Sequence, residues 1–140
     1  MLARSCVKGA AMEKEKYLGI ITKEVVSATE ETNAVELSRL IRDKEIGAVV
    51  ILKDDKVVGI VSERDLVTRI LAENLPADKS YAKDCMTREV ITVDFKEGLN
   101  KIYQTLCEIK FRHLLIMNGS KLVGITSRRD LLDALACKRR

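Results

Sequence analysis

Two segments of the chain place an aspartate three residues after a serine: Ser62 with Asp65, and Ser127 with Asp130. Each pair follows an apolar run and precedes a helical pattern, so the serine should end a strand and the aspartate should open a helix. Free N–H groups and the positive end of the dipole make a helix start attractive to phosphate. A carboxylate there could accept the two hydroxyl hydrogen bonds of a ribose. The residue types and their spacing therefore indicate a nucleotide site.

The same residues also fit a purely structural role. A serine that accepts from the first turn, with an acid at the third position reaching back, forms a capping box and stabilises a helix by about 1 kcal/mol. Arg64 and Arg129, which each precede an aspartate, could pair along the helix surface for little energy. The capping role does not exclude binding, and both interpretations stay open.

These segments belong to an internal repeat. Residues 56–66 return as residues 121–131, 65 positions later, with eight of the eleven residues identical. A repeat of this kind decides the architecture. Each unit of about 55 residues buries little apolar surface alone, so we expect the two copies to share a core.

Each unit is predicted to run strand, helix, strand, strand, helix. The expected strands are 24–28, 48–52 and 57–61, then 90–93, 113–117 and 122–126. The expected helices are 33–44 and 63–73, then 98–110 and 129–137. Gly47 should end the first helix, and the hairpins should turn at Asp54-Asp55 and at Asn118-Gly119.

The composition is that of a soluble globular chain, with 140 residues, 46% hydrophobic and 33% charged. No apolar run approaches the roughly 18 residues of a membrane span and no secretory signal is evident, so we expect a cytoplasmic protein. The net charge of +4 comes from residues 1–16 and 138–140, which leaves the body nearly neutral. No catalytic set and no metal-ligand spacing is found, so neither an enzyme nor a metal site is predicted.

The sequence Gly-Ile-Val-Ser-x-x-Asp at 59–65, its copy Gly-Ile-Thr-Ser-x-x-Asp at 124–130, and Asp-Cys-Met-Thr at 84–87 resemble the CBS domain pair, or Bateman module. The resemblance implies an α/β fold, a tandem CBS domain pair in which each repeat is β-α-β-β-α and the two form one compact module. The implied organisation is an N-terminal extension 1–16, CBS repeat 1 at 17–75, a linker 76–84, CBS repeat 2 at 85–137 and a basic tail 138–140.

The resemblance further implies a non-catalytic regulatory or energy-sensing module that requires no cofactor and binds AMP, ADP, ATP or adenosylmethionine in two clefts between the repeats. Each cleft combines the Ser-x-x-Asp end of one repeat with the first strand of the other. The residues implied for the dominant cleft are Ile21, Thr22, Val26, Ile46, Arg112, His113, Ser127, Arg129 and Asp130. Those implied for the second cleft are Ser62, Arg64, Asp65, Met86, Thr87, Ile91 and Phe111. Arg112 and His113 would face phosphate, whereas Gly47 and Ala48 replace them in the first repeat without charge.

Two other functions remain open. The chain could be an interaction module that regulates a protein partner without nucleotide, or a nucleic-acid binder, which only the basic termini favour. No membrane partner is expected. Apolar stripes on both helices of each repeat exceed what three strands can cover, and such patches commonly form symmetric interfaces. The sequence therefore predicts a homodimer.

Overall fold

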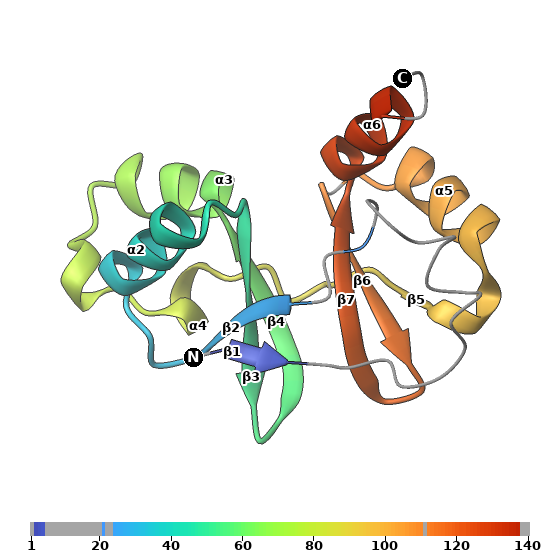
Figure 1. The fold of residues 1–140 in the computed structure, drawn as a ribbon. Helices are drawn as coiled ribbons and strands as arrows, with labels where there is room; N and C mark the ends of the chain where they lie inside the picture. Colours follow the sequence, from blue (N-terminus) through green and yellow to red (C-terminus); the bar gives the residue numbers. More distant parts are fainter. Residues whose placement is uncertain (1, 5–20, 22–23, 111, 138–140) are drawn as a thin grey trace. The chain divides into compact units, whose positions relative to one another are not determined.

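The structure is a computed structural model that describes residues 2–4, 21, 24–110 and 112–137. Contacts between Cα atoms divide the chain into two units, Met1–Ala3 with Val26–Val90, and Arg4–Val25 with Ile91–Arg140. Figure 1 shows the elements of both. Each unit contains its own buried apolar cluster.

The first unit holds a four-stranded sheet of order β1-β2-β3-β4. Its strands are β1 (Leu2–Arg4), β2 (Glu24–Thr29), β3 (Ala48–Lys53) and β4 (Lys56–Ser62). Its helices are α2 (Ala34–Lys44), α3 (Glu63–Asp65), the π-helix η1 (Leu66–Leu71), the 3-10 helix η2 (Ala77–Lys79) and α4 (Ala82–Cys85). Strand β2 runs parallel to β3, and β3 forms an antiparallel hairpin with β4.

The second unit repeats this plan with a three-stranded sheet of order β5-β6-β7. Its elements are β5 (Thr92–Asp94), the 3-10 helix η3 (Phe95–Glu97), α5 (Leu99–Glu108), β6 (His113–Asn118), β7 (Lys121–Ser127) and α6 (Arg128–Cys137). Strand β5 is parallel to β6, and β6 is antiparallel to β7. The predicted α/β class and the β-α-β-β-α order of each repeat are confirmed.

A bulge at the same place in both hairpins shows how closely the copies correspond. The register shifts after Ile51, which pairs with Gly59, and again after Ile116, which pairs with Gly124. A bulge increases the local twist of a hairpin. Ser62 and Ser127 are thus the last residues of two strands that have the same length and the same register shift.

Helix α2 begins as the sequence suggests and ends differently. Asn33 caps it, because its side chain accepts from the Glu36 N–H at 2.9 Å while the Glu36 carboxylate accepts from the Asn33 N–H at 3.1 Å. The prediction that Gly47 ends the helix is wrong, since the left-handed residue is Glu45, with φ 52. The Ile46 N–H donates to the Ile41 carbonyl at 3.1 Å, which closes a six-to-one C-cap and offsets the cost of that backbone conformation.

The two hairpin turns differ. Asp54 and Asp55 have φ values of 50 and 62, as a type I′ turn requires, and this prediction is confirmed. The second turn lies one residue later than predicted, because Asn118 pairs with Lys121. Gly119, with φ 62, therefore takes the first central position, where a type II′ turn needs glycine.

The segment after β4 departs from the regular helix that the sequence predicts. The helix predicted at 63–73 has one α-helical turn and then a π-wound stretch, in which the Ala72 N–H donates to the Val67 carbonyl at 2.8 Å. Residues 76–84, predicted as the linker, include η2 and the first three residues of α4, and Ala82 and Cys85 of α4 are fully buried in the core of the first unit. Within the part of the chain that the structure describes, no helix combines the length and hydropathy of a membrane span.

Asp94, the last residue of β5, connects this strand to the turn of the β6–β7 hairpin, and this connection can be tested. Its carboxylate accepts from the Lys96 N–H at 2.9 Å and from the Gly119 N–H at 3.0 Å, and these two bonds lower its pKa. Asp94→Asn should therefore lower the urea midpoint at pH 7. Because folding lowers the pKa of Asp94, its ionised carboxylate stabilises the fold at pH values above the pKa of the unfolded state, about 4. This stabilisation is lost as the pH falls through the pKa of the folded state. The deficit against wild type should thus shrink in acid; Asp78→Asn is the control, and a deficit unchanged down to pH 2.5 would contradict the assignment.

Candidate functional site

The Ser62–Asp65 corner joins the end of β4 to the start of α3. The Asp65 N–H donates to Ser62 Oγ at 3.2 Å, and Asp65 Oδ2 accepts from the Ser62 N–H at 2.8 Å and from Ser62 Oγ at 3.0 Å. This is the predicted capping box. Asp65 is nevertheless only 8% exposed, so its carboxylate depends on hydrogen bonds for solvation.

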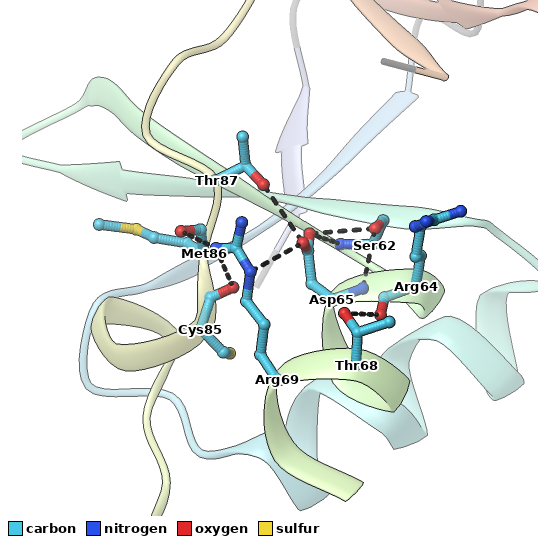
Figure 2. Close-up of polar contacts among 8 residues, drawn as sticks. All are labelled: Ser62, Arg64, Asp65, Thr68, Arg69, Cys85, Met86 and Thr87. Carbon is cyan, nitrogen blue, oxygen red and sulfur yellow. Dashed lines mark hydrogen bonds and ion pairs between the residues drawn. The ribbon is translucent and has the colours of Figure 1, made fainter. Parts of the chain in front are cut away.

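The other carboxylate oxygen of Asp65 faces two partners from elsewhere. Thr87 Oγ1 donates to Asp65 Oδ1 at 3.2 Å, and Arg69 Nε lies 3.6 Å from the same oxygen. Figure 2 shows Ser62, Thr87 and Arg69 converging on Asp65, whereas the side chain of Arg64 points away from the carboxylate. Arg69 also donates from Nη1 to the carbonyls of Cys85 at 3.1 Å and Met86 at 2.9 Å.

Thr87 reaches Asp65 because its backbone lies against β4. The Ile60 N–H donates to the Thr87 carbonyl at 3.0 Å and the Thr87 N–H donates to the Ile60 carbonyl at 2.8 Å. This approach requires Gly59, where a Cβ would lie 2.6 Å from Met86 Sδ and 3.0 Å from the Thr87 carbonyl oxygen. Gly59 of the repeated motif is therefore a residue of β4 that also allows Thr87 to approach Asp65.

The Ser127–Asp130 corner repeats the geometry in the second unit. Ser127 Oγ donates to Asp130 Oδ2 at 2.9 Å, and the Asp130 N–H donates to Ser127 Oγ at 3.2 Å. Asp130 is partly exposed. Ser127 Oγ is a hydrogen-bond partner of its carboxylate.

The basic residues predicted for this corner differ in their surroundings. His113 pairs with Ser127 across the β6–β7 hairpin, and directly opposite residues have their Cβ atoms about 5 Å apart. Arg112 is exposed and precedes His113 in the chain. Arg129 is directed along α6, with Nε 4.0 Å from Asp133 Oδ2 and a side chain that is 90% exposed. In the first unit, Ala48 pairs with Ser62 at the equivalent place.

The remaining predicted residues are divided between the units. Val26, Ile46 and Met86 pack in or against the core of the first unit. Ile21 and Ile91 pack against the core of the second. Thr22 and Phe111 lie outside the described residues. The structure thus brings together Ser62, Asp65, Met86 and Thr87 in one unit, and His113, Ser127 and Asp130 in the other.

Sequence reasoning missed Arg69. The sequence does contain an indication of its role: Arg69 follows Asp65 by four residues, and this spacing places the two side chains on one face of a helix. The corresponding position in the second repeat is Ala134, which carries no charge. In the described part of the chain, no cluster of three or more His, Cys, Asp or Glu side chains could hold a metal ion.

Comparison with known proteins agrees with this geometry. Residues 14–72 and 82–137 each match the CBS domain family. An uncharacterized protein of Methanopyrus kandleri is 31% identical over 116 residues, which cover 81% of this chain and 59% of that protein. The chain therefore spans less than two thirds of the length of that relative.

Solved structures show the same fold. The crystal structure of an uncharacterized conserved protein from Pyrococcus horikoshii has a TM-score of 0.75 at 31% identity and covers 83% of this chain and 88% of its own. A protein with CBS domains from Burkholderia ambifaria has a TM-score of 0.77 at 24% identity, covering 84% and 87% respectively, and supports the fold alone. Two β-α-β-β-α repeats, each with a Ser-x-x-Asp corner, define an α/β protein built from a tandem of equivalent modules. The chain belongs to the CBS domain family.

Cys85, which borders the first corner, should be chemically inert in the folded protein. Burial raises the pKa of its thiol to about 11, with the charges of Asp65 and Asp84 adding to the effect, and only the thiolate is nucleophilic. A variant that retains Cys85 as its single cysteine should react with a thiol reagent at pH 8 only after urea is added. The matched variant that retains only Cys107, which is exposed, should react at once. Rapid reaction of native Cys85 would show that α4 opens readily.

Proposed function

We propose that this protein is a non-catalytic regulatory module that senses an adenosine-containing ligand, AMP, ADP, ATP or adenosylmethionine, through the Ser127–Asp130 corner. The proposal depends on the position and the exposure of the Asp130 carboxylate. It is fixed at the start of α6 by Ser127 and is still partly exposed. A carboxylate that is held in place and open to solvent can accept the two hydroxyl groups of a ribose.

The charges around this corner support a phosphate-bearing ligand. His113 stands opposite Ser127, and Arg112 and Arg129 are exposed. Helix α6 begins at Arg128, so its unpaired N–H groups and dipole add positive potential near the serine. The first repeat has Ala48 where the second has His113, and it lacks a charge there.

Membership of the CBS family and the absence of a catalytic set in the sequence both support a regulatory rather than an enzymatic role. The alternative is a module that regulates a protein partner without nucleotide. Apolar side chains exposed on the second helix of each repeat favour it, since Val67 and Leu132, at equivalent positions, are 54% and 66% exposed. Ligand binding decides between the two.

Asp130→Asn should weaken AMP binding by about tenfold or more. The change removes the charge and one acceptor from a carboxylate that would receive two ribose hydroxyls, and hydrogen bonds to charged groups contribute about 1.5–3 kcal/mol each. Isothermal titration calorimetry with AMP and ATP would measure it, and Asp65→Asn is the matched variant in the other repeat, expected to leave most of the affinity intact.

Circular dichroism and urea unfolding would show that both variants fold. Loss of affinity in the Asp65 variant alone would reverse the assignment of the dominant site. If wild type binds none of the adenine nucleotides or adenosylmethionine, the interaction module becomes the better description.

We also propose that the protein is a homodimer formed through these helices. Leu71 is 74% exposed and Leu75 is 47% exposed in the same segment as Val67. Assembly is known among structural neighbours, since a CBS-CP12 protein of bloom-forming cyanobacteria is hexameric, although at 21% identity it shows the fold alone.

Light scattering at micromolar concentration should give twice the chain mass of 15.7 kDa. Leu71→Glu should reduce the measured mass to that of one chain, because a charge buried in an apolar interface is not compensated. Lys101→Glu, an exposed change on α5, should leave the dimer intact. A wild-type protein that scatters as a single chain would rule the dimer out.

A further inference from the structure

Both oxygens of the Asp65 carboxylate already have partners within the chain, three hydrogen bonds and one ion pair. An ionised carboxylate offers about four acceptor positions. Ser62 N–H and Oγ occupy Oδ2, at 2.8 and 3.0 Å, while the Thr87 hydroxyl at 3.2 Å and Arg69 Nε at 3.6 Å lie on Oδ1. With 8% of the residue exposed, little of the carboxylate faces solvent. A ribose could reach it only by displacing these groups.

Arg69 links this acid to the segment that supplies Thr87. Its Nη1 donates to the carbonyls of Cys85 and Met86, which are the last residue of α4 and its C-cap. Carbonyls at a helix C-terminus lack partners within the helix, and basic side chains commonly satisfy them. One guanidinium therefore holds both the Asp65 carboxylate and the backbone next to Thr87 (Figure 2).

We propose that Arg69 is a positioning residue that closes the Asp65 corner, so that the protein binds one adenosine ligand per chain, at Asp130. The ligand part of this proposal rests on the proposed function, while the closure itself does not. Arg69 keeps the Thr87 hydroxyl and its own Nε at the positions that ribose hydroxyls would need. The second repeat cannot form the same closure from its own helix, because residue 134 is alanine.

The closure depends on the shape of the guanidinium more than on its charge. The Arg69 side chain is 47% exposed, so solvent screens its attraction to Asp65 and an exposed ion pair alone contributes little. The planar fork, however, serves one carboxylate oxygen and two carbonyls at the same time. A lysine has a single ammonium on a flexible stem and cannot reproduce this arrangement. Arg69→Lys therefore separates charge from geometry.

The first measurement uses no ligand. Amide hydrogen exchange of the full chain would follow the Ile60 and Thr87 N–H groups, which bond to each other's carbonyls across the β4 bridge. Arg69→Gln and Arg69→Lys should both speed their exchange by about tenfold or more, since charge-assisted bonds that hold the segment are lost. Arg39→Gln, an exposed change on α2, should have no such effect. The Leu115 amide, which bonds to the Ile91 carbonyl in the second unit, should exchange at the same rate in all four proteins.

The second measurement is calorimetry with AMP. Wild type should bind one AMP per chain, and Arg69→Gln should bind a second that is abolished by adding Asp65→Asn. Unchanged exchange of Ile60 and Thr87 in both Arg69 variants would overturn the closure, as would a wild type that binds two AMP with one lost in Asp65→Asn. If no variant binds AMP while the exchange accelerates as expected, the proposed function fails and the closure stands as a structural feature of the first repeat.

Discussion

The close approach of Met86 and Thr87 to strand β4 is the constraint on which the first repeat depends. Gly59 permits this approach, since a Cβ there would lie 2.6 Å from Met86 Sδ and 3.0 Å from the Thr87 carbonyl oxygen, so these groups would have to shift. The approach buries Cys85 and Met86 in the core, completes hydrogen bonds of Ile60 on the free side of β4, and places the Thr87 hydroxyl on Asp65. A single glycine in the repeated motif thus connects the packing of α4 to the chemistry of the Ser-x-x-Asp corner.

The two repeats share a scaffold and differ in the side chains around it. The register shift of the hairpin and the serine hydroxyl bonded to an aspartate recur at the same offset. Opposite the serine, however, the first repeat has alanine and the second has His113. Four residues after the aspartate, the first has Arg69 and the second has alanine. The Asp65 carboxylate is buried and paired within the chain, whereas the Asp130 carboxylate is partly exposed.

Much of the fold could be predicted because local patterns determine it. The alternation of apolar residues and the duplicated motif located the six strands of the two repeats to within two residues, although they missed β1, and the serine–aspartate spacing predicted the helix caps. Predictions failed where an individual hydrogen bond, and not a pattern of residue types, decides the outcome. Glu45 adopts a left-handed conformation because the C-cap hydrogen bond of Ile46 favours it over Gly47. The function of Arg69 depends on carbonyls 16 and 17 residues away, which no periodicity reveals, and the predicted Arg64 points away from the acid that it precedes (Figure 2).

A buried carboxylate cannot both complete the internal structure and remain open to a ligand, because each acceptor position can serve only one donor. Duplication removes this conflict. One copy of the corner can use its aspartate to hold the segment that follows α4, with an arginine to compensate its charge, while the other copy keeps its aspartate accessible. The apolar residues of the strand before each serine need not change, since Ile60 and Ile125 occupy equivalent positions in the two repeats. Small substitutions around an unchanged backbone are therefore sufficient to give the same carboxylate two different environments in two otherwise similar modules.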